Sequence, residues 1–188
     1  FLQFFPPVGP NFKHVVINSL AQTELKKRKK LPSTIVPNVL DFQQPVWKID
    51  DYNRDLGAAI GVDANDIIIL QATRVSERKA IELEIDFVEA LNKPYNLYQI
   101  REKGLYDGRP FGANNRIQLL LAGLIECELG YLDLLIEKAR LSGIDLLLIN
   151  DFVEMERSEK EGKKIYALTD CYAIADFVTY PSVLEGWG

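Results

Sequence analysis

Apolar residues gather in short runs along the chain, separated by mixed stretches of helical length. The runs are continuously apolar rather than alternating, which is typical of strands covered on both faces of a parallel sheet. We expect such strands at residues 67–70, 117–121, 144–149 and 177–180. Helices are expected between them at residues 79–91, 131–141 and 166–175. The alternation predicts an α/β fold, a Rossmann-like parallel sheet with right-handed crossovers and helices on both faces.

The first 60 residues follow a less regular pattern. They predict a short strand, a helix, a basic run that closes this helix, a second strand and a polar helix. In that order, these are expected at 14–17, 20–25, 26–30, 34–36 and 50–60. Asn18 or Ser19 can cap the first helix, and the basic run suits the negative end of its dipole.

We expect a domain boundary near residue 60. Residues 1–60 are interpreted as an interdomain segment at the edge of a preceding domain, and residues 61–188 as the sheet domain. Within the sheet domain, segments 92–115 and 151–164 are rich in Pro, Gly, Asn or charged residues and are expected to be loops.

Composition and charge argue against several classes of function, among them nucleic-acid binding and membrane spanning. The 188 residues carry a net charge of −5, which gives no general attraction to nucleic acid or to anionic membranes. No apolar run reaches the ~20 residues that a transmembrane helix needs, and the apolar segment 1–7 lacks the basic leader of a signal peptide. Cys127 and Cys171 have no metal-ligand spacing and are expected to be buried thiols. We therefore expect a cytoplasmic protein without a metal site.

Cations gather directly after the first strand of the sheet domain. Arg74, Arg78 and Lys79 lie where a helix begins, and helix N-termini already attract anions. The excess of positive charge therefore favours a phosphate-binding loop. A solvated turn, in which Glu77 offsets one of the charges, is the alternative interpretation.

A second candidate lies after the last predicted strand. Pro181 and Ser182 form a turn. Glu185 follows, directly before Gly186 and near Gly188. A carboxylate at this place can accept hydroxyl groups of a sugar, and the backbone of Gly186 and Gly188 can approach a ligand closely. An exposed glutamate in a glycine-containing turn is the alternative.

Taken in order, these residues resemble a known family. Arg74 with Lys79 five positions later, Tyr172–Asp176 and Pro181–Gly188 look like motifs of the retaining glycosyltransferases of the GT-B fold, family-4 type. Residues 36–39 resemble the turn that joins the two domains of these enzymes. The resemblance runs from about residue 14 to residue 188.

The resemblance implies a role for each matching residue. Arg74 and Lys79 would hold the diphosphate of a nucleotide-sugar donor and act in catalysis. Glu185 would also act in catalysis and would contact the donor sugar, beside Ser182 and the backbone of Gly186, Trp187 and Gly188. The nucleotide base would rest near Phe152 and Val153. The implied enzyme is a hexosyltransferase that retains configuration and uses the nucleotide sugar as donor substrate, with no cofactor.

The sequence also departs from the family pattern. Thr73 stands where the family prefers Gly before the Arg, and Ala80 stands where it prefers Gly after the Lys; both residues are small. A second family glutamate lies eight positions after the first, beyond Gly188. We therefore expect a donor-binding fragment that is truncated at its C-terminal end, lacks the N-terminal acceptor domain and is inactive by itself.

Two other functions fit the same architecture. One is a nucleotide-sugar epimerase, and the other is a non-catalytic nucleotide-binding or structural domain. His14, Trp47 and Tyr52 are interpreted as packing residues, and Asp176 as a residue that fixes local backbone. Segment 106–109 has no assigned role.

Overall fold

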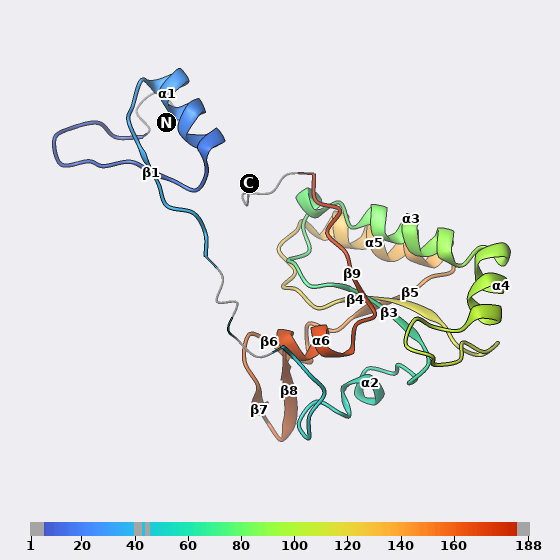
Figure 1. The fold of residues 1–188 in the computed structure, drawn as a ribbon. Helices are drawn as coiled ribbons and strands as arrows, with labels where there is room; N and C mark the ends of the chain where they lie inside the picture. The colour runs from blue at the N-terminus through green and yellow to red at the C-terminus, as the bar shows by residue number, and fades with distance from the viewer. Residues whose placement is uncertain (1–5, 40–42, 44–45, 184–188) are drawn as a thin grey trace. The chain divides into compact units, whose positions relative to one another are not determined.

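A computed structural model of the chain describes residues 6–39, 43 and 46–183 (Figure 1). The chain divides into two compact units between residues 45 and 46. The larger unit therefore begins before the predicted boundary near residue 60. The interpretation of residues 1–60 as an interdomain segment stays a prediction.

The first unit is a small strand–helix–strand element. Strands β1 (Val15–Val16) and β2 (Thr34–Ile35) pair in parallel, and helix α1 (Ser19–Lys29) connects them. The Asn18 side chain accepts a hydrogen bond of 2.8 Å from the backbone N–H of Ala21 and so caps the helix, as predicted. The basic run fills the last turn of α1.

The second unit contains a parallel sheet with the strand order β5-β4-β3-β9. Its strands are β3 (Ile67–Gln71), β4 (Ile117–Leu121), β5 (Asp145–Leu148) and β9 (Phe177–Val178). Every residue of β3 and β4 is buried, which confirms the interpretation of their apolar runs. The α/β prediction with a parallel sheet is confirmed.

Helices cover both faces of this sheet (Figure 1). On one face, α3 (Glu82–Leu91) and α5 (Leu129–Leu141) pack on Ile69 and Leu119. On the other face, α2 (Leu56–Ala59) and α6 (Leu168–Ile174) pack on Leu70 and Leu120. Successive strand residues thus point to opposite cores, as the pleat requires.

The prediction of a loop over residues 92–115 was wrong in its first half. Helix α4 (Pro94–Lys103) lies there, with Pro94 in its first turn, where the missing N–H costs no hydrogen bond. Leu97 and Ile100 pack against the core that α3 and α5 share. The Pro and Asn residues that indicated a loop instead mark the start of a helix.

The predicted loop over residues 151–164 was also wrong. Strands β6 (Val153–Glu154), β7 (Ser158–Lys160) and β8 (Lys163–Ala167) form a small sheet in the order β6-β8-β7. Glu161 and Gly162, both at positive φ, make the two-residue turn between β7 and β8. Tyr166, predicted to start a helix, lies in β8.

Residues 46–60 contact this small sheet and α6, and the expected helix over 50–60 is limited to α2. A network of polar side chains replaces most of the expected polar helix. The Asp170 carboxylate accepts hydrogen bonds from Asn53 at 2.9 Å and from Arg157 at 2.6 Å. The Tyr52 hydroxyl reaches the backbone oxygens of Ser158 and Ile165, each at 2.9 Å. Tyr52 therefore packs this segment in place, as predicted.

Candidate functional site

The strand order identifies where a ligand can bind. From β3 the chain proceeds to β4 and then to β5 on one side, whereas β9 pairs with β3 on its other side. The direction of winding thus reverses between β3 and β9. In open parallel sheets the crevice at the carboxyl ends of two such strands is the usual ligand site. This arrangement is that of a Rossmann-like domain.

The loop after β3 carries Arg74, and the loop after β4 fixes its backbone. The N–H of Val75 donates to the Leu124 oxygen at 2.9 Å, and the N–H of Glu126 donates to the Val75 oxygen at 3.1 Å. A Cβ atom on Gly123 would lie 1.9 Å from the Thr73 oxygen, so only glycine allows this approach. The sequence interpretation did not assign a role to Gly123.

Arg74 forms an ion pair that sequence reasoning did not find. Its Nη1 lies 2.9 Å from Oε2 of Glu126, which comes from the loop after β4. The Arg74 side chain is 67% exposed, and such surface pairs contribute about 0–1 kcal/mol. An incoming anion can therefore compete with Glu126 for the guanidinium.

Lys79 lies at the end of the short 3-10 helix η1 (Glu77–Lys79) and is only 7% exposed. The next residue, Ala80, has a φ of 50° in the left-handed region that favours glycine. A glycine at this position would adopt the same conformation without the strain that a Cβ causes.

The turn after β9 lies against η1. The backbone N–H of Val183 donates to the Arg78 oxygen at 3.0 Å. The neighbouring Ser182 hydroxyl is buried and has no hydrogen-bond partner among the described residues. The structure thus brings Ser182 to the loop that carries Arg74 and Lys79. Glu185, Gly186, Trp187 and Gly188 lie outside the described residues.

Phe152 and Val153 lie beyond the end of β5. Val153 belongs to β6 and is buried in the core beneath α6. The N–H of Phe152 donates to Ile149, and its oxygen accepts from Tyr166. The Phe152 side chain is exposed and is the part of this pair that is accessible to a ligand. The expected contact of Phe152 and Val153 with the nucleotide base of the donor stays a prediction.

Asp176 fixes backbone, as predicted. One of its carboxylate oxygens accepts from the N–H of Ile68 at 2.8 Å, and the other pairs with the Arg109 guanidinium. Arg109 also donates to the Ala64 oxygen at 2.7 Å. Segment 106–109 therefore has a structural role, since it fastens the start of β9 beside β3.

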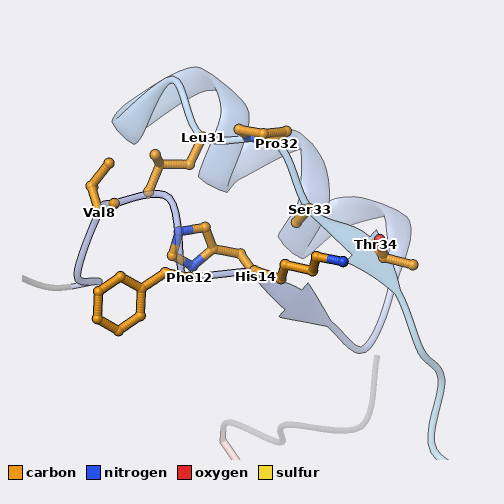
Figure 2. A pocket seen from close by; sticks show the side chains of 9 residues that line it. Val8, Phe12, His14, Leu31, Pro32, Ser33 and Thr34 are labelled. Atoms are coloured by element: carbon orange, nitrogen blue, oxygen red, sulfur yellow. The ribbon is translucent and has the colours of Figure 1, made fainter.

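His14 lines a pocket within the first unit (Figure 2). This pocket has a volume of about 330 Å³ and is open on one side. Its lining comes from the segment before β1 and the segment that leads into β2: Val8, Gly9, Phe12, Lys13, His14, Leu31, Pro32, Ser33 and Thr34. The lining contains Lys13 and His14 but no acidic side chain.

Within the described ranges, no three or more His, Cys, Asp or Glu side chains form a cluster that could hold a metal ion. The expected absence of a cofactor and of a metal stays a prediction. In the same part of the chain, none of the helices has both the length and the apolar character needed to cross a membrane.

Two curated proteins are similar to nearly the whole chain. The chain is 44% identical over 186 residues to the mannosylglucosylglycerate synthase of Petrotoga mobilis, covering 99% of this chain and 42% of that protein. It is 42% identical over 184 residues to the mannosylglucosylglycerate synthase of Thermotoga maritima, covering 98% and 40% respectively. The chain thus spans about two fifths of the length of these relatives.

Both relatives are glycosyltransferases by name, which is the class that the resemblance implied. These alignments give no support to the expectation of a separate N-terminal acceptor domain, which stays a prediction. No family model matches the chain, and no solved structure is significantly similar to it.

Proposed function

We propose that this chain forms the donor-binding part of a glycosyltransferase that takes a sugar from a nucleoside-diphosphate donor. The proposal rests above all on the hydrogen bond of 3.0 Å between Val183 and Arg78. This bond joins the cationic loop after β3 to the turn after β9, at the crevice where sheets of this kind bind ligands. The similarity to two synthases supports the class of reaction.

Arg74 and Lys79 carry the chemistry in this proposal. Negative charge develops on the departing diphosphate as the bond to the sugar breaks, and fixed cations stabilise that charge. Lys79 is buried and therefore held in one place, whereas Arg74 is exposed and turns from Glu126 to the phosphate. Glu185 contacts the sugar, and transfer proceeds with retention of configuration within a GT-B architecture.

The relatives' name suggests the substrates. A mannosylglucosylglycerate is formed when a mannosyl group is added to a glucosylglycerate. We therefore take a nucleoside-diphosphate mannose as the donor and glucosylglycerate as the acceptor. No comparison favours the epimerase or the non-catalytic function, since both relatives are named as synthases.

The test is a double substitution in the full-length protein, Arg74→Ala with Lys79→Ala. With GDP-mannose and glucosylglycerate as probes, we expect kcat/KM to fall by at least ~10³-fold. Arg140→Ala is the matched control, because Arg140 is an exposed cation on α5 that pairs with Glu137 of the same helix. Unchanged kinetics in the double variant would refute the assignment, and an isomerised sugar nucleotide as product would indicate an epimerase.

A further inference from the structure

The carboxylate of Glu126 lies beside a cation of the proposed donor site, although an acid at this place opposes the binding of a diphosphate. Its Oε2 atom lies 2.9 Å from Nη1 of Arg74, at hydrogen-bonding distance. The acid repels an incoming anion, and it also occupies the guanidinium that would hold that anion. The transfer chemistry proposed above does not use Glu126.

The backbone of both partners is fixed. Val75, which follows Arg74, is fully buried, and its N–H and C=O groups both bond to the loop that carries Glu126. Cys127, which follows Glu126, packs against the core that α3 and α5 share. The two charged residues are therefore held close together, and their ion pair can open and close through side-chain rotation alone.

Both side chains of the pair remain accessible to solvent, since Arg74 is 67% exposed and Glu126 is 45% exposed. Exposed ion pairs are weak, so a phosphate group can take over the guanidinium without displacing any core residue. The pair of Arg109 with Asp176 differs, because the Asp176 side chain is only 4% exposed and its carboxylate also accepts from Ile68. Of these two pairs, the one between Arg74 and Glu126 is thus suited to exchange with a ligand.

Sugar transfer changes the charge of the ligand at this place. As the bond between the sugar and the terminal phosphate breaks, the phosphate oxygen keeps the electron pair. The sugar is taken by the acceptor hydroxyl, which loses its proton. The nucleoside diphosphate that remains carries an additional negative charge relative to the donor, so Arg74 attracts the product more strongly than the substrate. Release of such a product often limits the turnover of an enzyme.

We infer that Glu126 competes with the nucleoside diphosphate product for Arg74 and so promotes its release. The inference rests on the proposed function for the identity of the product. When the diphosphate moves away, the guanidinium returns to Glu126, which stabilises the empty site and weakens the affinity for every ligand that uses Arg74. Removal of Glu126 should therefore tighten binding. A purely structural role would have the opposite sign, because a disturbed loop binds the ligand less well.

The test is Glu126→Gln in the full-length protein, with GDP as the probe. For an exposed pair we expect the Kd of GDP, measured by calorimetry, to fall about three- to fivefold. The inhibition constant of GDP in the transfer assay should fall by the same factor. Glu128→Gln is the matched control, because it removes the same charge two residues further along, where the exposed side chain makes no capping hydrogen bond with α5. An equal effect of Glu128→Gln would overturn the inference.

A double-mutant cycle shows whether the effect acts through Arg74. In an Arg74→Ala background, Glu126→Gln should change the Kd of GDP by less than about 1.5-fold, because the shared partner is gone. Tightening that persists in this background would mean direct repulsion of the ligand by Glu126. That result would overturn the inference, as would unchanged or weaker GDP binding in Glu126→Gln alone.

Inorganic pyrophosphate, which has neither base nor sugar, separates this inference from the proposed function. If transfer is absent but pyrophosphate binds Glu126→Gln more tightly through Arg74, the proposed function fails and the competition at Arg74 stands. If transfer proceeds and both probes bind the wild type and the variant equally, the inference fails and the proposed function stands. If neither probe binds and no sugar is transferred, both fail.

Discussion

A carboxyl group is buried at each end of strand β3, and the two groups differ in their hydrogen bonds. At the amino end, Asp66 is fully buried and both of its oxygens have partners. It accepts from the backbone N–H groups of Arg116 at 2.8 Å and Asp63 at 3.1 Å, and from Gln118 at 3.1 Å. At the carboxyl end, only one oxygen of Glu84 has a hydrogen-bond partner among the described residues.

This difference distinguishes a buried polar group that holds the fold together from one that can serve another purpose. A saturated carboxylate such as Asp66 joins the starts of β3 and β4 and has no capacity left for a ligand. A carboxyl group with one free oxygen costs folding free energy, and such a cost is retained mainly where the group serves another purpose. Asp66 directly precedes β3, and Glu84, on α3, contacts the last residue of that strand, so variants at the two ends test this contrast directly.

The largest effect is expected at the amino end. Asp66→Ala removes the acceptor of these hydrogen bonds in a buried place, and we expect it to lower the free energy of unfolding by about 4 kcal/mol. Asp145→Ala is the control, since the Asp145 side chain is 45% exposed and its Oδ2 lies 3.4 Å from Nη1 of Arg116, a surface pair. This variant should change stability by less than about 0.5 kcal/mol. Urea denaturation at pH 7 measures both. Equal effects of the two variants would contradict the structural role of Asp66.

The second-largest effect is expected for Glu84, near the carboxyl end of β3, as a dependence of the free energy of unfolding on pH. Burial raises the pKa of Glu84 from 4.5 to about 7, so the folded state keeps a proton that the unfolded state has lost. This contribution to stability is complete below pH 4.5 and is lost as the pH rises through 7. The loss amounts to about 3 kcal/mol.

Chemical denaturation across this pH range measures the loss, with Glu84→Gln as the comparison. The amide does not titrate, so the difference in unfolding free energy between the two proteins should grow with pH in favour of Glu84→Gln. Parallel curves for the two proteins would show that Glu84 does not titrate in this range.

A somewhat smaller effect is expected in the loops at the carboxyl end. Gly123→Ala drives a methyl group against the Thr73 oxygen, where the Cβ would lie at 1.9 Å. We expect a loss of about 2–3 kcal/mol and a displaced Arg74 loop. Gly130→Ala, on α5 with no atom within 4 Å of its Cβ, should instead stabilise the protein by up to about 1 kcal/mol. Thermal unfolding of the two variants should move in opposite directions.

The smallest effect concerns the backbone between Lys79 and α3. Ala80→Gly relieves the left-handed conformation at φ 50°, which costs about 1–2 kcal/mol for a residue with a Cβ. The added freedom of glycine in the unfolded chain offsets about 0.4–1 kcal/mol of that gain. We expect a net stabilisation of about 0.5 kcal/mol, measured by denaturation. A destabilised variant would show that this conformation is not strained.

The sequence predicted the parts of the fold that depend on local pattern. Continuous apolar runs located β3 and β4 because a buried parallel strand has no polar face. Helix α4 and strands β6 to β8 were missed, since their polar residues resemble loop composition and their helical or strand state depends on tertiary packing. The turn between β7 and β8 did carry a signal in Gly162, next to Glu161.

The candidate site was predictable to the extent that topology dictates it. Arg74 and Ser182 both follow parallel strands, so their loops had to emerge at the same edge of the sheet. The partner Glu126 lies 52 residues from Arg74, and no local pattern reveals such a contact. Glu84 was missed because it lies between Leu83 and Ile85 in an amphipathic helix, where its burial depends on how the helix docks.

The ion pair between Arg74 and Glu126 affects how strongly the binding of an anionic donor depends on ionic strength. An arginine without a partner attracts a diphosphate less strongly as salt is added, because counterions screen the charges. Here the same salt also weakens the competing pair with Glu126, which is exposed to the same solvent. The two effects oppose each other, so the affinity for an anionic donor should vary less with salt concentration than the number of cations around the crevice suggests.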